Sequence, residues 1–360
     1  GMVCLSMLVF NLIYSLHLRA GDRRMRRRVE KIAGKVRPQL QRAEAGAALE
    51  ERHIAAMRRC LSRVNNLLAF DRFLDEQGET QASGAYLRQL QPIFLELALV
   101  YQRREETQAA YFCYFLTRHQ LQRYLDTEQL ESVVGGYMKK DSLYCRVNAL
   151  KALCSFGSAE GVLEALRNLR GHGVPLHEKI IVETLLTFTG DANRLIGQVW
   201  QDLEQFTVPI QRALLDFIRF KSGDYCENML GILLDDSKDR ELRFSAIRYF
   251  GRYPYPPVRQ PLLAAVTDLN PLNWEFAAIS AASLARYSGD DVVEALSQAM
   301  HSGNWYVRYN AAASLAAHGL SYEKLVDVVA GDDRYAREMM VYRLESRRLA
   351  EENEGMTAGV

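Results

Sequence analysis

The sequence predicts an all-α protein, an α-α superhelix in which pairs of helices follow one another and longer helices precede them. Three observations lead to this fold. Glycines recur in the C-terminal half at spacings of 33, 33, 66 and 30 residues, at Gly157, Gly190, Gly223, Gly289 and Gly319. A pair of residues four apart, apolar in nearly every copy, precedes each glycine and marks one helix face. No linker rich in Pro, Gly or Ser separates this array from the aromatic-rich segments before it.

Each copy is predicted to contain two helices joined by a turn. A helix stops at a glycine that accepts the left-handed conformation, and the next helix starts at a short polar N-cap. The expected N-caps are Ser158, Asp191, Asp224 and Asp290. The residue pairs that mark the first helices are Ala149 with Leu153, Val182 with Leu186, Leu214 with Ile218, Ala246 with Phe250, Ser280 with Leu284, and Ala311 with Leu315. The copy without a glycine turns at the proline-rich residues 253–257. Six helix pairs therefore run from about Asp141 to Gly331.

Two copies of this unit coincide at an offset of 31 residues. Asn273-Trp274 aligns with Asn304-Trp305, and Ala-Ala-Ser-Leu-Ala occurs at both 281–285 and 312–316. The units resemble the HEAT family, and more narrowly the short HEAT-like repeats of phycobilisome lyases. Those repeats open with an aromatic-Val-Arg step, continue Ala-Ala-x-x-Leu and turn at Gly. The resemblance covers a little over half of the chain. It implies a solenoid with one continuous core and implies little about function.

Positive charge is concentrated near the N-terminus. The chain has 360 residues, 48% of them hydrophobic, and a formal net charge of +1. Residues 19–37 hold nine Lys or Arg against two acidic residues, so the rest of the chain is acidic.

This basic segment follows seventeen mostly apolar residues, 2–18, which we interpret as a single membrane anchor at the short limit for a span. A signal peptide would carry its basic residues before the apolar segment rather than after it. The positive-inside rule then places the rest of the chain on the cytoplasmic side of the plasma membrane. The residues expected at the membrane interface are Arg23, Arg24, Arg26, Arg27 and Arg28. The alternative is that residues 2–18 form a helix that caps the end of the solenoid.

The expected organisation has four parts. Residues 1–37 form the anchor and a basic juxtamembrane helix, and residues 38–140 form divergent helix pairs. Within the second part, residues 40–75 are predicted to be one long amphipathic helix, and residues 86–101 and 107–125 two further helices. Residues 141–345 form the HEAT-like array, and residues 346–360 a polar tail whose last part, 351–360, is expected to fray.

The sequence offers little chemistry, so we expect no catalytic residues, no cofactor and no metal. The six cysteines form no C-x-x-C pair and are expected to be buried thiols. A HEAT-repeat iron enzyme, deoxyhypusine hydroxylase, holds its metals with several His-Glu pairs, whereas this chain has one, His177-Glu178. We interpret His177 as a residue at a helix start. A HEAT-repeat enzyme, lyase-like or metal-dependent, remains the alternative.

Nucleic-acid binding is not expected either. In the predicted second helices we count five basic against thirteen acidic residues, and a phosphate backbone would be repelled there. Trp274 and Trp305 occupy equivalent positions, which favours packing between helix pairs over base stacking.

We therefore expect a non-catalytic, bacterial-type scaffold for protein–protein interaction, tethered to the cytoplasmic face of a membrane. It would recruit or regulate a protein partner, either a membrane protein or a protein that offers a basic segment to the acidic second helices. A solenoid adaptor without an anchor is the further alternative. The residues that bind the partner are not apparent from the sequence.

Overall fold

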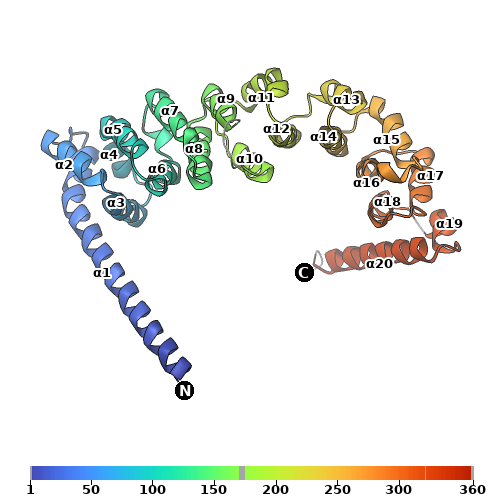
Figure 1. Cartoon of the computed structure of the whole chain (residues 1–360), viewed down its shortest axis with the longest axis horizontal. Helices are drawn as coiled ribbons and strands as arrows, with labels where there is room; N and C mark the ends of the chain where they lie inside the picture. The colour runs from blue at the N-terminus through green and yellow to red at the C-terminus, as the bar shows by residue number, and fades with distance from the viewer. Residues whose placement is uncertain (1, 170–174, 321, 358–360) are drawn as a thin grey trace. The chain divides into compact units, whose positions relative to one another are not determined.

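The computed structural model describes the backbone of residues 2–169, 175–320 and 322–357, and the side chains of residues 21–169, 175–320 and 322–349. Its secondary structure is helical, and no β-strand occurs in these ranges, so the all-α class is confirmed. The chain divides into two compact units, Gly1–Phe206 and Thr207–Val360. The boundary falls between the second and the third predicted helix pair, where the sequence indicated no interruption. Figure 1 labels the helices of both units.

The first unit contains α1 to α11. Their bounds are α1 (Met2–Glu44), α2 (Glu51–Leu61), α3 (Val64–Gln77), α4 (Gln81–Gln89), α5 (Gln91–Gln102), α6 (Glu106–Arg118), α7 (Glu128–Gly135), α8 (Leu143–Phe156), α9 (Ala159–Asn168), α10 (Glu178–Leu185) and α11 (Ala192–Gln201). α1 packs against α3 and α4, α6 against α8, α8 against α10, and α9 against α11. Within the unit, each helix is thus covered by its neighbours along the chain.

The second unit contains α12 to α20. Their bounds are α12 (Val208–Lys221), α13 (Cys226–Leu234), α14 (Arg240–Arg252), α15 (Arg259–Val266), α16 (Trp274–Ser283), α17 (Asp290–Ala299), α18 (Trp305–Ala317), α19 (Val326–Val329) and α20 (Arg334–Thr357). α12 packs on α14, α14 on α16, α16 on α18, and α18 on α20. The six predicted helix pairs are therefore present as α8 to α19, and the first helix of one pair contacts the first helix of the next within each unit.

Two predicted N-terminal helices are broken in the structure. The amphipathic segment 40–75 consists of the end of α1, then α2 and α3, which are separated at Ser62 and Arg63. The helix expected at 86–101 is interrupted at Leu90, and α5 restarts with Pro92 in its first turn. A proline is tolerated only there, because its missing N–H would be unpaired in any case.

An aromatic core fills the first unit between α3, α5 and α6. Phe70, Phe94 and Phe115 are fully buried, and the Phe115 ring centroid lies 6.0 Å from that of Phe70 and 6.2 Å from that of Phe94. Tyr101 stacks on Phe112 at 5.0 Å, and its hydroxyl donates to the Leu61 carbonyl at 2.8 Å. The aromatic residues noted in the sequence thus bind the N-terminal helices into one core.

The turns within the helix pairs follow the prediction in part. Gly157 ends α8 in the left-handed conformation, and Ser158 and Asp191 cap α9 and α11 through their side chains. The N-caps expected at Asp224 and Asp290 are wrong. α13 begins after Tyr225, and Asp290 is already the first residue of α17.

Gly190 has a different role from the one predicted, since it has no positive φ. A Cβ atom at this position would lie 2.0 Å from the Gly157 carbonyl oxygen and 2.7 Å from the Phe188 ring. A glycine is therefore required here because two turns lie in close contact. The backbone conformation of Gly190 itself would allow a side chain.

Replacing Gly190 with alanine is expected to lower the free energy of unfolding by about 2–3 kcal/mol, because the backbone around Gly157 has to move. Gly197→Ala is the matched control, since Gly197 lies inside α11 with no atom within 4 Å of the added Cβ. That control should be neutral or stabilising by up to about 1 kcal/mol. Denaturant titration of both variants measures the difference, and equal effects would contradict the contact described here.

An arginine recurs at the fourth position of four helices. Arg243 of α14 donates to the Leu233 carbonyl at 2.9 Å, Arg308 of α18 to the Ser302 carbonyl at 2.7 Å, and Arg337 of α20 to the Gly331 carbonyl at 2.6 Å. Arg146 of α8 donates to the Asp141 carbonyl at 3.4 Å. Each of these arginines thus satisfies a carbonyl in the turn or helix end before its own helix.

The polar C-terminal segment differs from its prediction. The sequence indicated a polar tail from residue 346 that frays from residue 351, whereas α20 continues to Thr357. Met340 and Leu344 are buried, and α20 packs on α18 and α19, so this packing stabilises the helix up to about Leu344.

Candidate functional site

The basic segment predicted at the membrane interface lies on α1 before the point where this helix packs on the first unit. Arg23, Arg24, Arg26 and Arg27 are exposed, and Arg28 is half-buried. None of the five makes an ion pair or a hydrogen bond with another described side chain. Successive residues of a helix are turned by about 100°, so these five guanidinium groups spread over roughly 200° of the helix circumference. The side that they leave open is the one that continues into the buried residues Val29 and Ile32.

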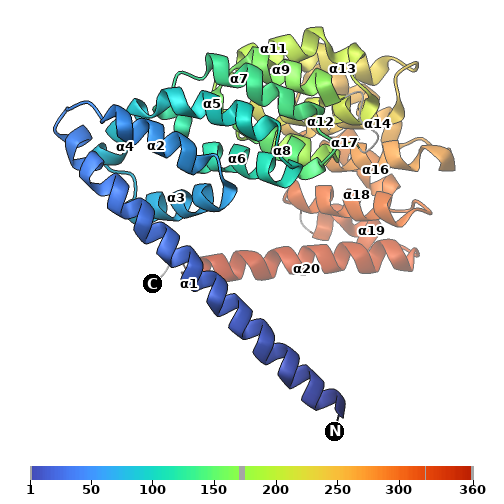
Figure 2. The same ribbon diagram turned by 60° about the vertical axis from the view of Figure 1, so that its left-hand side comes forward.

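The packed half of α1 begins immediately afterwards. Val29, Ile32, Val36 and Leu40 are buried against α3 and α4. α1 is one helix of 43 residues, or about 65 Å. Its N-terminal half extends away from the other helices of the first unit (Figures 1 and 2).

The anchor predicted at residues 2–18 lies outside the residues whose side chains are described, although their backbone belongs to α1. Among the described residues, no helix has the length and apolar character needed to span a bilayer. The anchor therefore stays a prediction.

The acidic second helices are partly neutralised by arginines. Glu160 pairs with Arg194 at 2.5 Å, and Asp202 pairs with Arg167 at 2.5 Å. Further ion pairs join Asp236 to Arg243 and Asp291 to Arg259. Some carboxylates of these helices have neither an ion pair nor a side-chain hydrogen bond with a described residue, namely Glu227, Asp290, Glu323 and Asp327. Much of the acidic charge therefore links neighbouring helices.

Aromatic side chains gather instead on α16, α18 and α20. Trp274 stacks on Tyr306 of the next first helix with ring centroids 5.7 Å apart, as predicted for packing between helix pairs. Trp305 differs from its prediction, since it is 50% exposed and stacks on Tyr309 of its own helix at 4.7 Å. Tyr335 and Tyr342 of α20 are each 67% exposed. The sequence analysis did not find this surface.

A second cluster lies between α3 and α6 around Asp71, a residue the sequence did not single out. Asp71 is 5% exposed, its Oδ1 lies 2.6 Å from Nε2 of His119, and its Oδ2 accepts a hydrogen bond from Tyr111. Arg118 contacts Asp71 at 3.5 Å and also pairs with Asp75.

Ligand atoms of Asp71, Asp75 and His119 lie within 4.8 Å of one another, a spacing that suits a metal ion. The guanidinium group of Arg118 already contacts both carboxylates, however, and Tyr111 occupies the second oxygen of Asp71. We therefore assign this network to holding α6 on α3.

The environment of Asp71 lowers the pKa of its carboxyl. Burial alone would raise that pKa, but the hydrogen bonds from His119 and Tyr111 and the charge of Arg118 outweigh burial. A pKa lower in the folded than in the unfolded chain stabilises the protein above the unfolded value of about 4. That stabilisation is lost as the pH falls through the folded pKa.

Asp71→Asn is therefore expected to cost about 2–3 kcal/mol of unfolding free energy at pH 7. The difference from the wild type should shrink as the pH falls below about 4. Asp75→Asn is the matched control, because its side chain is 41% exposed and its surface ion pair contributes under about 1 kcal/mol. Urea titrations across this pH range measure both, and a pH-independent difference would contradict the assignment.

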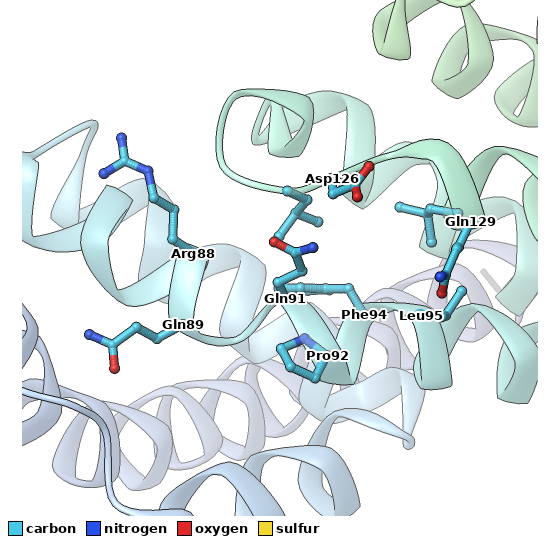
Figure 3. Close-up of a pocket in the computed structure, with 10 residues that line it drawn as sticks. Arg88, Gln89, Gln91, Pro92, Phe94, Leu95, Asp126 and Gln129 are labelled. Atoms are coloured by element: carbon cyan, nitrogen blue, oxygen red, sulfur yellow. The ribbon is translucent and has the colours of Figure 1, made fainter.

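Figure 3 shows a pocket of about 390 Å³ beside the junction of α4 and α5. Phe94, Leu95 and Pro92 contribute apolar surface, and Gln91, Asp126 and Gln129 contribute polar groups. Its charged side chains are Arg88 and Asp126, and no nucleophile or second acid accompanies them among the lining residues. The pocket therefore lacks the converging groups of an active site.

The thiols and His177 are accounted for by structure. Among the described cysteines, Cys113, Cys145 and Cys154 are buried, whereas Cys60 and Cys226 are half-buried, so the expectation of buried thiols is wrong for these two. Burial raises the pKa of Cys145 to about 11 and that of Cys154 to about 12. Such thiols stay protonated at neutral pH and are poor nucleophiles. His177 caps α10 by accepting a hydrogen bond from the Lys179 backbone N–H at 3.1 Å, so its interpretation as a helix-start residue is confirmed.

No protein-family model matches the sequence, and no curated protein matches it. The function of the protein is therefore inferred from the surfaces described above.

Proposed function

We propose that this protein is a membrane-tethered, non-catalytic scaffold whose HEAT-type helix pairs form a superhelix and hold a protein partner near the inner face of the membrane. The observation that carries the proposal is the order of segments along α1. An apolar stretch comes first, a cluster of arginines without an ion pair to a described side chain second, and a helix face packed on the first unit third.

The length of the apolar stretch of α1 fits a membrane span followed by arginines. Seventeen helical residues measure about 25 Å, close to the hydrocarbon thickness of about 30 Å. The next turns would carry Arg23–Arg28 into the head-group layer. The long arginine side chains can reach the lipid head groups around the helix at this level.

The same geometry argues against residues 2–18 as a cap. A cap has to lie on the exposed end of a helical array, but the N-terminal half of α1 extends away from the helices of the first unit (Figure 2). The enzyme alternative has less support, because Arg118 occupies the one ligand cluster identified among the described side chains.

Fractionation of the source cells with an alkaline carbonate wash tests the tether. We expect the full-length protein to stay in the washed membranes, because carbonate removes peripheral proteins and leaves spans in place. Recovery of the protein in the supernatant would favour the adaptor without an anchor.

Neutralising the five arginines from Arg23 to Arg28 with glutamine should weaken binding of the purified chain to vesicles that contain phosphatidylserine. Each basic residue near such a surface contributes about 1 kcal/mol. Vesicles of phosphatidylcholine alone are the control, since they should bind wild type and variant equally. Flotation measures both, and equal loss from the two kinds of vesicle would contradict lipid-head contact.

A further inference from the structure

We propose that the outer surface of α18 and α20 binds an acidic, aromatic-bearing linear segment of a partner protein. We name this surface the α18–α20 ridge and define it by Trp305, Tyr306, Tyr309, Tyr342 and Arg343. The inference rests on the proposed function as a partner-binding scaffold, and it names the binding site and the chemistry of the partner.

The aromatic residues of the ridge are not required by the helix-pair architecture. At the offset of 31 residues, Tyr306 and Tyr309 correspond to Glu275 and Ala278, so only Trp305 has an aromatic counterpart in the preceding copy. Packing alone would not place three large rings on α18 with exposed fractions of 50%, 57% and 38% for Trp305, Tyr306 and Tyr309. Exposed clusters of Trp, Tyr and Arg are typical of residues that dominate protein interfaces.

The rings are held in place before any partner binds. Tyr309 lies between two neighbours, since Trp305 stacks on it at 4.7 Å and the Arg343 guanidinium carbon lies 4.1 Å from its ring centroid. Tyr306 contacts both Trp274 and Trp305. Side chains fixed in this way lose little conformational entropy on binding.

A shallow groove of about 430 Å³ continues from these rings between the two helices. Ala313, Ala316 and Ala317 form its α18 side, and Arg343, Ser346 and Arg347 form its α20 side. Small side chains on one wall let the backbone of an extended segment approach closely. A membrane surface would need a protruding apolar edge instead of a hollow, so the shape favours a peptide.

The charge of the groove selects the partner. Arg343 contacts Tyr309 and makes no ion pair with any described carboxylate. The acidic residues nearby on α20 already have arginine partners, Glu338 with Arg334 at 2.7 Å and Glu345 with Arg348 at 3.0 Å. A carboxylate of the bound segment would therefore pair with Arg343. A second copy of this chain is disfavoured, because a two-fold contact would bring like charges together.

Selection from a library of random linear peptides on the purified full-length chain tests the proposal. We expect the enriched peptides to combine Asp or Glu with an aromatic residue. The best peptide should bind Arg343→Glu and Trp305→Ala at least about tenfold more weakly than the wild type. Lys221→Glu is the matched control, because it reverses an exposed charge on α12 and should leave binding unchanged. Melting curves of each variant show that folding is retained.

The proposal would be overturned if no peptide is enriched, if the enriched peptides lack carboxylates, or if the best peptide binds Arg343→Glu as tightly as the wild type. It would also be overturned if the wild-type chain self-associates and Trp305→Ala abolishes that self-association. Weaker flotation of Trp305→Ala with phosphatidylserine vesicles would assign the ridge to lipid and would also overturn it. Retention of the Arg343→Glu variant in carbonate-washed membranes is measured separately. The tether can therefore hold when the ridge proposal fails, and the reverse is also true.

Discussion

Deleting residues 2–20 is expected to move the protein from the carbonate-washed membrane fraction into the supernatant completely. The deletion removes the only apolar stretch in the chain that precedes the arginine-rich turns. It should leave the melting temperature unchanged within about 2 °C. The reason is that Val29 is the first buried residue among the described side chains of α1, so the packed half of the helix keeps all its described contacts with α3 and α4.

A double substitution tests whether the deletion releases the protein because the anchor is lost or because the chain is shorter. Leu8→Arg with Leu12→Arg places two charges in the apolar stretch, each costing about 3 kcal/mol in a bilayer, and should release the protein as the deletion does. A clear fall in melting temperature in either variant would instead support residues 2–18 as a cap. Continued retention in the membrane would assign membrane binding to another part of the chain.

Phe115→Ala is expected to cost about 4 kcal/mol of unfolding free energy in the first unit. Phe115 is fully buried and its ring contacts those of Phe70, Phe94 and His119. Truncation leaves a cavity at the meeting point of α3, α5 and α6, and the side chain of His119 loses its packing above Asp71. This loss is large compared with the total stability of an ordinary domain.

Leu99→Ala in α5 is the matched control, since Leu99 is 45% exposed and its truncation should cost under about 1 kcal/mol. Equilibrium denaturation followed by tyrosine fluorescence and by circular dichroism measures both variants. Two units can unfold in separate steps, so the expected signature is a shift of one transition with the other unchanged. Equal effects of the two substitutions would contradict the core described for the first unit.

Helix positions in the array were predictable because their signals are local. Gly157 and Ser158 end one helix and start the next through contacts within a few residues, and the same holds for Asp191. Gly190 could be located, but its role could not, because the atom that forbids a side chain there belongs to Gly157 in another turn. The breaks at Ser62 and Leu90 were missed, since the apolar pattern continues across both.

The candidate sites also differ in whether a local sequence signal marks them. The arginine cluster was visible as a charge run, and the structure places its members in exposed positions. The Asp71 network was not visible, because Asp71 and His119 are 48 residues apart and meet only through the packing of α3 and α6. The α18–α20 ridge did leave a signal, namely that Tyr306 and Tyr309 break the match between two otherwise aligned copies.

The central claim is that residues 2–18 cross the membrane and that everything after the arginine cluster lies on its cytoplasmic side. Protease digestion of membrane vesicles of both orientations tests it most directly. The account predicts that α2 to α20 are degraded in inside-out vesicles and protected in right-side-out ones. Degradation in right-side-out vesicles, or absence of the protein from both preparations, would contradict it.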